Sequence, residues 1–292
     1  MQKIVIYPSE YGKPRKVDTE YEFEKTITDK FGVYIALINY DEYIYMGKNL
    51  HLTFLTDIPE EPTEGIYRGW MLSPEQYKVM YESLKLANIV LVNNPEEYKN
   101  AHWFNRAYEK ISDYTPKIAV FSDKDTIDWN EVRAYFSGKF MIKDYVKSVK
   151  EWDYPEYLDF TYTDKELDTL VEKFKEIRGD LYTGGIILKE YASLKKTSGK
   201  THEFRGFYYK GRLITLYHNS ENYEDDLIPI KEFAESMPKL DSNFYTIDFA
   251  LTSDNKILII ETGDGQVSGL PTIEEAEALH EQLFKWFIYK NT

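Results

Sequence analysis

The stretch FYTIDFALTSDNKILIIETGDGQVSGLP, residues 244–271, contains two apolar runs that each carry a carboxylate. Asp248 lies inside the first run, Glu261 ends the second, and Asp264 follows three residues later. The polar residues 253–255 between the runs predict a turn and therefore a hairpin of two core strands. A buried, unpaired carboxylate is strongly unfavourable, so these acids need a partner. A cation of the protein, a bound metal ion or a charged ligand would each serve.

The composition limits what the protein can be. The chain has 292 residues, of which 42% are hydrophobic, and this is ample for a sizeable core. It has no cysteine, which excludes disulfides, thiolate metal sites and a cysteine nucleophile. The net charge of −14 argues against nucleic acid as a general partner. The sequence has no run of apolar residues long enough to span a membrane and no signal-peptide pattern, so we expect a cytoplasmic protein.

The first part of the chain, residues 1–124, alternates strand and helix patterns. Strands are expected at 3–7, 33–40 and 51–55, and helix starts at Ser73-Pro74 and Asn94-Pro95. This alternation is typical of an α/β domain.

Shorter elements follow. A strand at 139–143, a helix at 164–178 and a strand at 184–191 predict a second domain over 125–188. The third, over 189–292, reads as antiparallel hairpins closed by a final helix at 272–290. No long linker separates the three, so we expect ligand clefts between closely packed domains.

Ionic residues recur on the expected strands. Lys143 ends one strand, Lys189 and Glu190 interrupt another, and Arg205 shares a strand face with Glu203. Each also has a purely structural explanation. Lys143 would reach solvent at a strand end, Lys189 and Glu190 would pair with each other, and Arg205 would form a cross-strand ion pair.

Taken together, two lysines, one arginine and three acids are what a magnesium–nucleotide site needs. The cations hold phosphates, and the carboxylates hold a metal ion that bridges them. The chain lacks a GxxxxGK[ST] loop, a GxGxxG motif and the kinase HRD and DFG motifs, so a P-loop, Rossmann or kinase site is not indicated.

The order of these motifs resembles the ATP-grasp superfamily. The matching stretches are LKEY (188–191), EFRGF (203–207), IDFAL (247–251) and IIETGDGQVSGLP (259–271). The likeness is greater to the phage and bacterial clade named for an arginine and two lysines, and to the eukaryotic cell-division-cycle family that helps assemble translation initiation factor 2. It covers roughly residues 139–271, and YRGWMLSPEQY (67–77) also looks like that clade. The resemblance implies an ATP-grasp fold, with two α+β subdomains that clasp ATP behind an N-terminal α/β domain.

The resemblance also implies roles for single residues on the nucleotide side. Lys143 and Lys189 would contact the ATP phosphates, with Lys189 also near the adenine. Glu190 and the backbone at Tyr191 would form the hinge that reads the adenine edge. Arg205 would hold the γ-phosphate or the acyl-phosphate, so that Arg205 and Lys143 are the expected catalytic residues.

Asp248 and Glu261 would be the magnesium ligands. Asp264 stands where the superfamily often has asparagine, and this departure leaves its role as a third ligand open. For Arg68 we hypothesise a place on the substrate side of the cleft, with a surface cation stacked on Trp70 as the alternative.

Two further features are less specific. Loop 193–202 would either close over the phosphates or be an ordinary hairpin. His102 and His218 read as structural or solvent-facing.

The implied activity is that of an ATP- and Mg²⁺-dependent carboxylate–amine ligase that works through an acyl-phosphate. Its substrates would be small molecules, peptides or proteins, with no membrane partner. The alternative is an ATP-binding assembly factor for a protein partner without ligase chemistry, and a third possibility is a non-catalytic interaction module. The sequence leaves the substrates and the oligomeric state open.

Overall fold

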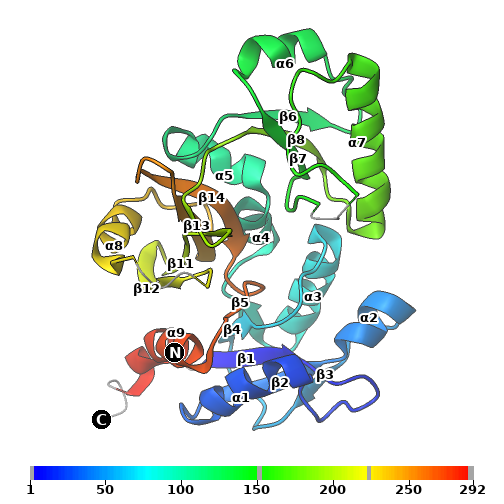
Figure 1. Cartoon of the computed structure of the whole chain (residues 1–292). Coiled ribbons are helices and arrows are strands. Elements are labelled where there is room, and N and C mark those ends of the chain that lie inside the picture. Colours follow the sequence, from blue (N-terminus) through cyan, green and yellow to red (C-terminus); the bar gives the residue numbers. More distant parts are fainter. Residues whose placement is uncertain (1–2, 150–152, 222–224, 289–292) are drawn as a thin grey trace.

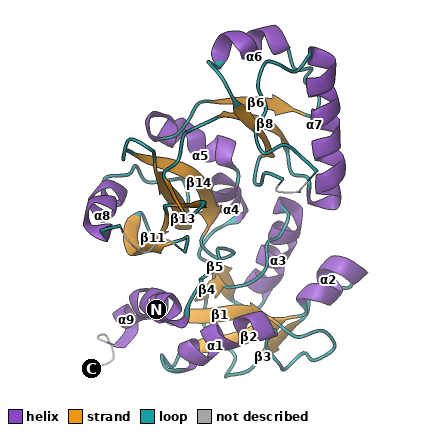
Figure 2. Ribbon diagram, in the orientation of Figure 1, coloured by secondary structure: helices purple, strands orange, loops and turns teal. Residues whose placement is uncertain are grey.

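The computed structural model describes residues 3–149, 153–221 and 225–288. The chain forms three larger sheets, of five, three and four strands, and helices lie beside each of them (Figures 1 and 2). Within these ranges, we find no helix with the length and apolar character needed to cross a bilayer.

The N-terminal sheet has the strand order β3-β2-β1-β4-β5. Its strands are β1 (Lys3–Pro8), β2 (Tyr34–Ile38), β3 (Leu52–Phe54), β4 (Thr63–Tyr67) and β5 (Ile89–Leu91). β1 pairs in parallel with β2 and β4, and β4 with β5, while β3 is antiparallel to β2. The parallel core confirms the α/β character predicted for this part.

The helices of this part begin at the predicted signals. They are α1 (Glu22–Asp29), α2 (Tyr40–Met46), α3 (Pro74–Leu86), α4 (Pro95–His102) and α5 (Phe104–Ile111). Ser73 and Asn94 cap α3 and α4 in capping boxes, each with a proline in the first turn. The cap at Asn94 fixes the start of α4, which carries His102 at its other end.

A three-stranded antiparallel sheet has the order β6-β8-β7. Its strands are β6 (Ile118–Ser122), β7 (Phe140–Asp144) and β8 (Gly185–Glu190), covered by α6 (Trp129–Tyr135) and α7 (Asp164–Arg178). β6 lies before the expected boundary at 124 and position 188 falls inside β8, so this sheet contains residues from either side of both expected domain boundaries, which stay predictions. An apolar run does not reveal its own pairing partner, so the sequence could not assign β6 to this sheet.

The C-terminal sheet is antiparallel throughout, with the order β12-β11-β13-β14. Its strands are β11 (Glu203–Tyr209), β12 (Arg212–His218), β13 (Phe244–Leu251) and β14 (Ile257–Asp264). The small hairpin β9 (Lys196–Thr197) and β10 (Lys200–Thr201) precedes it, and α8 (Leu227–Glu235) packs beside it.

The last helix, α9 (Ile273–Ile288), returns to the N-terminal part and packs on α1 and β12. One apolar core contains Val5 and Leu37 of the N-terminal sheet, Phe207 of β11, and Leu279 and Leu283 of α9. The two ends of the chain therefore share a core, whereas the β6-β8-β7 sheet packs a separate one against α6 and α7.

Candidate active site

Arg205, Asp248 and Glu261 form one row across the C-terminal sheet. Arg205 of β11 is the register partner of Asp248 of β13, and Asp248 is the register partner of Glu261 of β14. Directly opposed residues of antiparallel strands project from the same face, so the three side chains lie side by side. The two carboxylates that stand out in the sequence thus share a single site.

The carboxylates of this row are paired with cations. Arg205 donates from Nε and Nη2 to the two oxygens of Asp248, at 2.8 and 2.7 Å. Lys147 donates from Nζ to Oε1 of Glu261 at 2.9 Å. A cross-strand ion pair was the structural alternative for Arg205, and the structure contains one, made with Asp248. An ion pair of this kind does not rule out a ligand site, because a metal ion and phosphates can replace each partner.

The charge state of Glu261 follows from its neighbours. Its position deep in the cleft acts to raise its pKa, but Lys147 and Lys143 outweigh this and lower the pKa to about 2. For Arg205, burial acts to lower the pKa, and the Asp248 carboxylate outweighs it so that the pKa is raised. Both side chains are therefore charged at neutral pH.

Lys143 and Lys189 face this row from the other sheet. They lie on adjacent strands β7 and β8 and are only 4% and 5% exposed. Both ammonium groups lie over the ring of Phe104, with Nζ at 4.8 and 4.3 Å from its centre, and Lys189 donates to the carbonyl of Ile260 at 2.6 Å.

Within the described residues, neither lysine is ion-paired with a carboxylate. Burial lowers the pKa of both, and for Lys189 the nearby Lys143 adds to the effect. Two adjacent buried ammonium groups are unfavourable until an anion joins them, and this arrangement suits phosphate oxygens.

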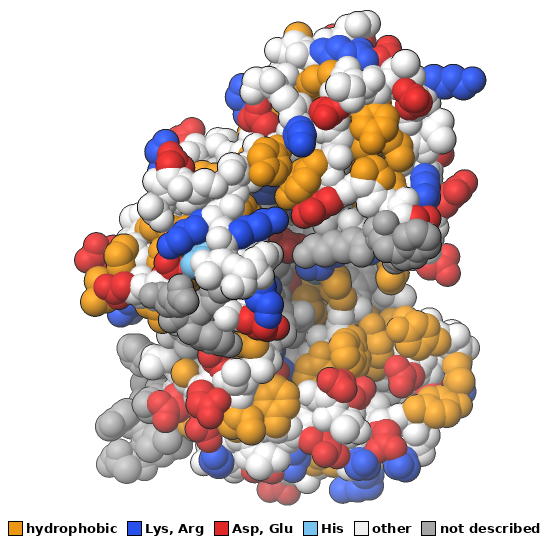
Figure 3. Space-filling model, in the orientation of Figure 1, with side chains coloured by type: hydrophobic (Ala, Val, Ile, Leu, Met, Phe, Trp, Pro, Cys, Tyr) orange, Lys and Arg blue, Asp and Glu red, His pale blue; other side chains and the backbone are white. Residues whose placement is uncertain are grey.

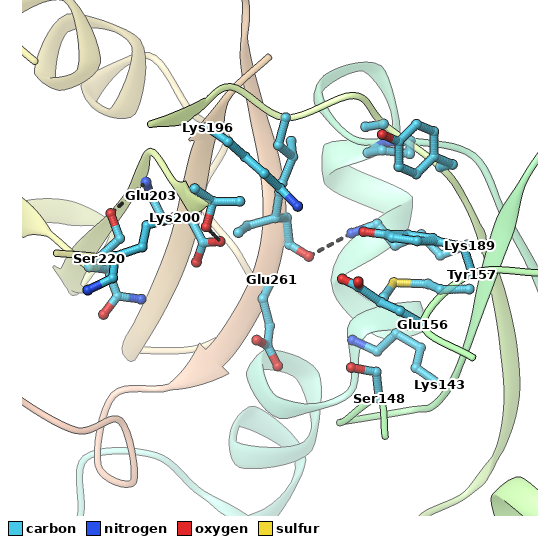
Figure 4. A pocket seen from close by; sticks show the side chains of 18 of the residues that line it. Lys143, Ser148, Glu156, Tyr157, Lys189, Lys196, Lys200, Glu203, Ser220 and Glu261 are labelled. Carbon is cyan, nitrogen blue, oxygen red and sulfur yellow. Dashed lines mark hydrogen bonds between the residues drawn. The ribbon is translucent and has the colours of Figure 1, made fainter. Parts of the chain in front are cut away.

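A cavity of about 1180 Å³ separates the two sheets. Figure 4 shows Lys143 and Lys189 on one side of it, Lys196, Lys200 and Glu203 on the other, and Glu261 between them. The hairpin predicted at loop 193–202 is present as β9 and β10, with a turn at Ser198-Gly199 where both residues have left-handed φ, 53° and 81°. Lys196 and Lys200 of this hairpin line the cavity, and its closure over a ligand stays a prediction.

Glu190 and Tyr191 lie at the end of β8 and line the same cavity. Glu190 accepts a hydrogen bond from the Ser137 hydroxyl at 3.2 Å, and the Tyr191 ring packs edge-on against Tyr157. The Tyr191 N–H already donates to the Lys139 carbonyl at 2.8 Å. A backbone contact from this hinge to an adenine therefore has to use another group than that N–H.

A second, smaller cavity of about 100 Å³ shares Lys147 and Glu261 with the large one. Arg205 and Asp248 line it from the sheet, and His102 at the end of α4 lines it from the N-terminal part. Burial, followed by the positive charge of Lys147, lowers the pKa of His102 to about 3, so its imidazole is neutral. His102 was expected to be structural or solvent-facing, and the structure places it at the cavity wall.

The comparison with protein families settles which fold this site belongs to. Residues 127–283 match the model of an ATP-grasp domain, described as family 3 of the clade named for an arginine and two lysines. The chain belongs to this ATP-grasp family. The resemblance seen in the sequence is confirmed, and the arginine and two lysines of the predicted motifs lie around the two adjoining cavities of this ATP-grasp protein.

Solved structures show the same fold over nearly the whole chain. The D-alanine-D-alanine ligase from Coxiella burnetii aligns with a TM-score of 0.58 at 14% identity, covering 99% of this chain and 96% of the other. The RimK domain protein ATP-grasp from Sphaerobacter thermophilus gives 0.58 at 12% identity, with 97% and 98% covered. The ATP-grasp ligase PsnB, complexed with a phosphomimetic variant of minimal precursor, Mg and ADP, gives 0.57 at 10% identity, with 97% and 96% covered. No curated protein matches the sequence.

Asp264 lies apart from the other acids of the ATP-grasp site. It is three positions after Glu261 on β14, an odd spacing that directs the two side chains to opposite faces. Asp264 is fully buried, accepts hydrogen bonds from Asn93 Nδ2 at 2.5 Å and from the Gln266 N–H at 2.9 Å, and lines neither cavity. This position does not fit a third metal ligand beside Glu261.

Asp264 should make the stability of the protein pH-dependent. Burial raises its pKa from 3.8 to about 7, so between these values the folded state holds a proton that the unfolded state has lost. Stability therefore falls as the pH rises through this range and changes little outside it. We expect the unfolding free energy of Asp264→Asn, relative to the wild type, to increase by on the order of a few kcal/mol from pH 4 to pH 7. Urea unfolding of both proteins across this pH range measures the difference in unfolding free energy. A difference that does not change with pH would contradict a raised pKa of Asp264.

Arg68 is in the interior instead of the cleft. It is 1% exposed and donates from Nε and Nη2 to both oxygens of Glu24, each at 2.8 Å. Its Nη1 donates to the carbonyls of Gly265 and Ser268 at 2.6 and 2.9 Å. The alternative of a surface cation stacked on Trp70 is wrong, because the guanidinium of Arg68 is buried in an ion pair with Glu24. These contacts fit a residue that positions the 265–268 loop better than one that binds substrate directly.

Two site residues escaped the sequence-based assignment. Lys147 follows Lys143 by four residues and pairs with Glu261, a contact that its place beyond the end of the strand does not reveal. Phe104 lies under both buried lysines and gives no signal in the sequence, because one aromatic in a helix normally indicates core packing.

Proposed function

We propose that this protein is an ATP- and Mg²⁺-dependent ligase that joins a carboxylate to an amine through an acyl-phosphate. The observation that carries the proposal is that two buried lysines, without an ion-pair partner among the described residues, line the large cavity together with Glu261, while Arg205 and Asp248 of the same row line the adjoining small cavity. Membership of the ATP-grasp family supports ATP as the nucleotide. The fold shared with a D-alanine-D-alanine ligase and with the ATP-grasp ligase PsnB supports the reaction class.

Asp248 and Glu261 fit a magnesium ion. Mg²⁺ in nucleotide sites is bound through one or two carboxylates together with phosphate oxygens and water. The two acids are opposed in register, and within the described residues no cluster of three or more acidic or imidazole groups would form an all-protein cage. When bound, the ion would neutralise phosphate charge and draw electrons from the transferred phosphorus.

The chain's own residues supply the rest of the mechanism. Lys143 and Lys189 would hold the ATP phosphates, and Arg205 would hold the γ-phosphate while charge moves to the leaving oxygen. A carboxylate oxygen attacks the γ-phosphorus, a new O–P bond forms, and ADP leaves. The amine nitrogen then attacks the acyl carbon, phosphate leaves, and the nitrogen gives up a proton. No protein nucleophile is needed, in keeping with a chain that has no cysteine.

The alternative is an ATP-binding assembly factor, which would use the large cavity alone. The second cavity, beside Arg205 and Glu261, favours the ligase because a ligase must admit a second reactant next to the γ-phosphate.

The test is a search for the condensation product. We expect the wild type, incubated with Mg-ATP, a mixture of amino acids and short peptides, and hydroxylamine, to give hydroxamates that mass spectrometry detects together with ADP. Hydroxylamine captures an acyl-phosphate whatever the natural amine is. Mg-ATP binding with no hydroxamate from any carboxylate, while a protein partner co-purifies, would favour the assembly factor instead.

A further inference from the structure

The two cavities suggest how the reactants are placed, if the proposed function holds. They share Lys147 and Glu261 as a common wall. In phosphoryl transfer the attacking and leaving oxygens lie on opposite sides of the phosphorus. ATP in the large cavity, with its γ-phosphate at the shared wall and within reach of Arg205 and Asp248 of the small cavity, therefore leaves the remainder of the small cavity as the place of the attacking carboxylate.

The small cavity limits what can enter it. Its volume is about 100 Å³, less than a tenth of that of the large cavity. A carboxylate group is only a small part of an amino acid or peptide, so we place the remainder of the substrate toward the opening of this cavity.

The walls of the small cavity offer polar groups that the protein itself does not use. Nδ1 of His102 and Oγ1 of Thr262 are buried and have no hydrogen-bond partner in the described part of the chain. Both side chains are more than nine-tenths buried and both line the cavity, together with Arg205. Unsatisfied buried groups of this kind point to a polar ligand.

Exposed apolar side chains lie beside the small cavity. Met71 lines the cavity and is 42% exposed, and the neighbouring Trp70 is 40% exposed. Tyr45 is 76% exposed and packs edge-on against Tyr40, a buried residue whose hydroxyl donates to the Met71 carbonyl. Figure 3 shows hydrophobic side chains gathered on the N-terminal part where it faces the hollow. We call Trp70, Met71 and Tyr45 the apolar rim.

We propose that the substrate is a carboxylate with a bulky apolar or aromatic group next to it, as at the hydrophobic C-terminal residue of a peptide. The carboxylate occupies the small cavity against His102, Thr262 and Arg205, and its apolar group rests on the apolar rim. The inference rests on the proposed function for its assignment of ATP to the large cavity. It adds the chemical class of the carboxylate and makes Met71 and Trp70 the residues that determine specificity.

Binding of simple probes tests this without requiring turnover. Calorimetry with Mg²⁺ and a non-hydrolysable ATP analogue would compare N-acetyl-phenylalanine, N-acetyl-glycine and N-acetyl-phenylalaninamide. We expect the phenylalanine acid to bind at least about tenfold more tightly than the glycine acid, because only it covers the apolar rim. The amide should bind at least about tenfold more weakly than the acid, because it lacks the charge that Arg205 recognises.

Substitutions at the apolar rim and in the small cavity test where the substrate binds. Met71→Ser should remove the preference for phenylalanine over glycine, whereas Ile228→Ser, an equally simple loss of an exposed apolar side chain on α8, should leave it unchanged. Thr262→Val should weaken both acids by a similar factor, and His102→Phe, which keeps a ring beside Tyr98, should do the same. Equal affinity for the phenylalanine and glycine acids, or a preference unaffected by Met71→Ser, would overturn the inference.

The two proposals fail separately. Hydroxamate formation that favours small or charged carboxylates would overturn the apolar rim as a specificity element and leave the ligase intact. Selective binding of the phenylalanine acid without any hydroxamate would uphold the carboxylate site and overturn the ligase.

Discussion

Glu261→Gln should reduce Mg²⁺-dependent ATP turnover by at least about 100-fold. The variant keeps the size of the side chain but removes the charge that Lys147 now neutralises and that a magnesium ion would need. It should also abolish the stabilisation of the wild type by Mg-ATP, which at a ligand concentration of 100 times Kd amounts to about 2.7 kcal/mol. Thermal unfolding with and without Mg-ATP measures this directly.

Asp264→Asn is the matched control for this experiment. It also replaces a carboxylate of β14 by its amide, but at a position that faces Asn93 and Gln266, away from both cavities. We expect it to retain Mg-ATP stabilisation and turnover. Loss of both in Asp264→Asn, or retention of both in Glu261→Gln, would show that the assignment of the metal side is wrong.

Arg68→Met should destabilise the protein by roughly 3–5 kcal/mol, because it leaves Glu24 as a buried, unpaired carboxylate. Glu24 is only 2% exposed, and burial acts to raise its pKa, but Arg68 outweighs this and lowers it. The substitution also frees the carbonyls of Gly265 and Ser268 that Arg68 now holds. Equilibrium unfolding in urea gives the change in free energy.

Lys25→Met provides the comparison for Arg68→Met. Lys25 pairs with Asp29 on α1 at 2.7 Å, but the side chains are 28% and 48% exposed, so its loss should change stability by less than about 1 kcal/mol. The double variant Glu24→Leu with Arg68→Met should lose less than the sum of its single variants, because neither charge remains without its partner. Normal stability of Arg68→Met combined with weaker substrate binding would instead return Arg68 to the substrate side of the cleft.

Much of the fold could be predicted because its signals are local. The capped starts of α3 and α4, the helix predicted at 164–178 and the hairpin turn at residues 253–255 all depend on neighbouring residues. The sequence could not place β6 beside β8, because pairing with a strand that comes much later in the chain depends on tertiary packing.

In the candidate site, too, local signals could be predicted from the sequence and contacts made in space could not. Ionic residues on apolar strands drew attention to five residues, and the structure brings all of them to two adjoining cavities that share Glu261: Lys143, Lys189, Arg205, Asp248 and Glu261. The role of Asp264 stayed open in the sequence, and the alternating faces of the extended strand now place its side chain away from that of Glu261. His102 could not be found, since a histidine at a helix end acquires meaning only from what surrounds it in space.

The core shared by the two ends of the chain has a consequence for fragments of this protein. Val5 and Leu37 of the N-terminal sheet pack with Leu279 and Leu283 of α9, which are synthesised much later. A truncated product that stops before residue 273 would expose this apolar face to water, and such a surface promotes aggregation. The N-terminal part is thus completed only once α9 has been synthesised, while the β6-β8-β7 sheet has its described core residues well before that point.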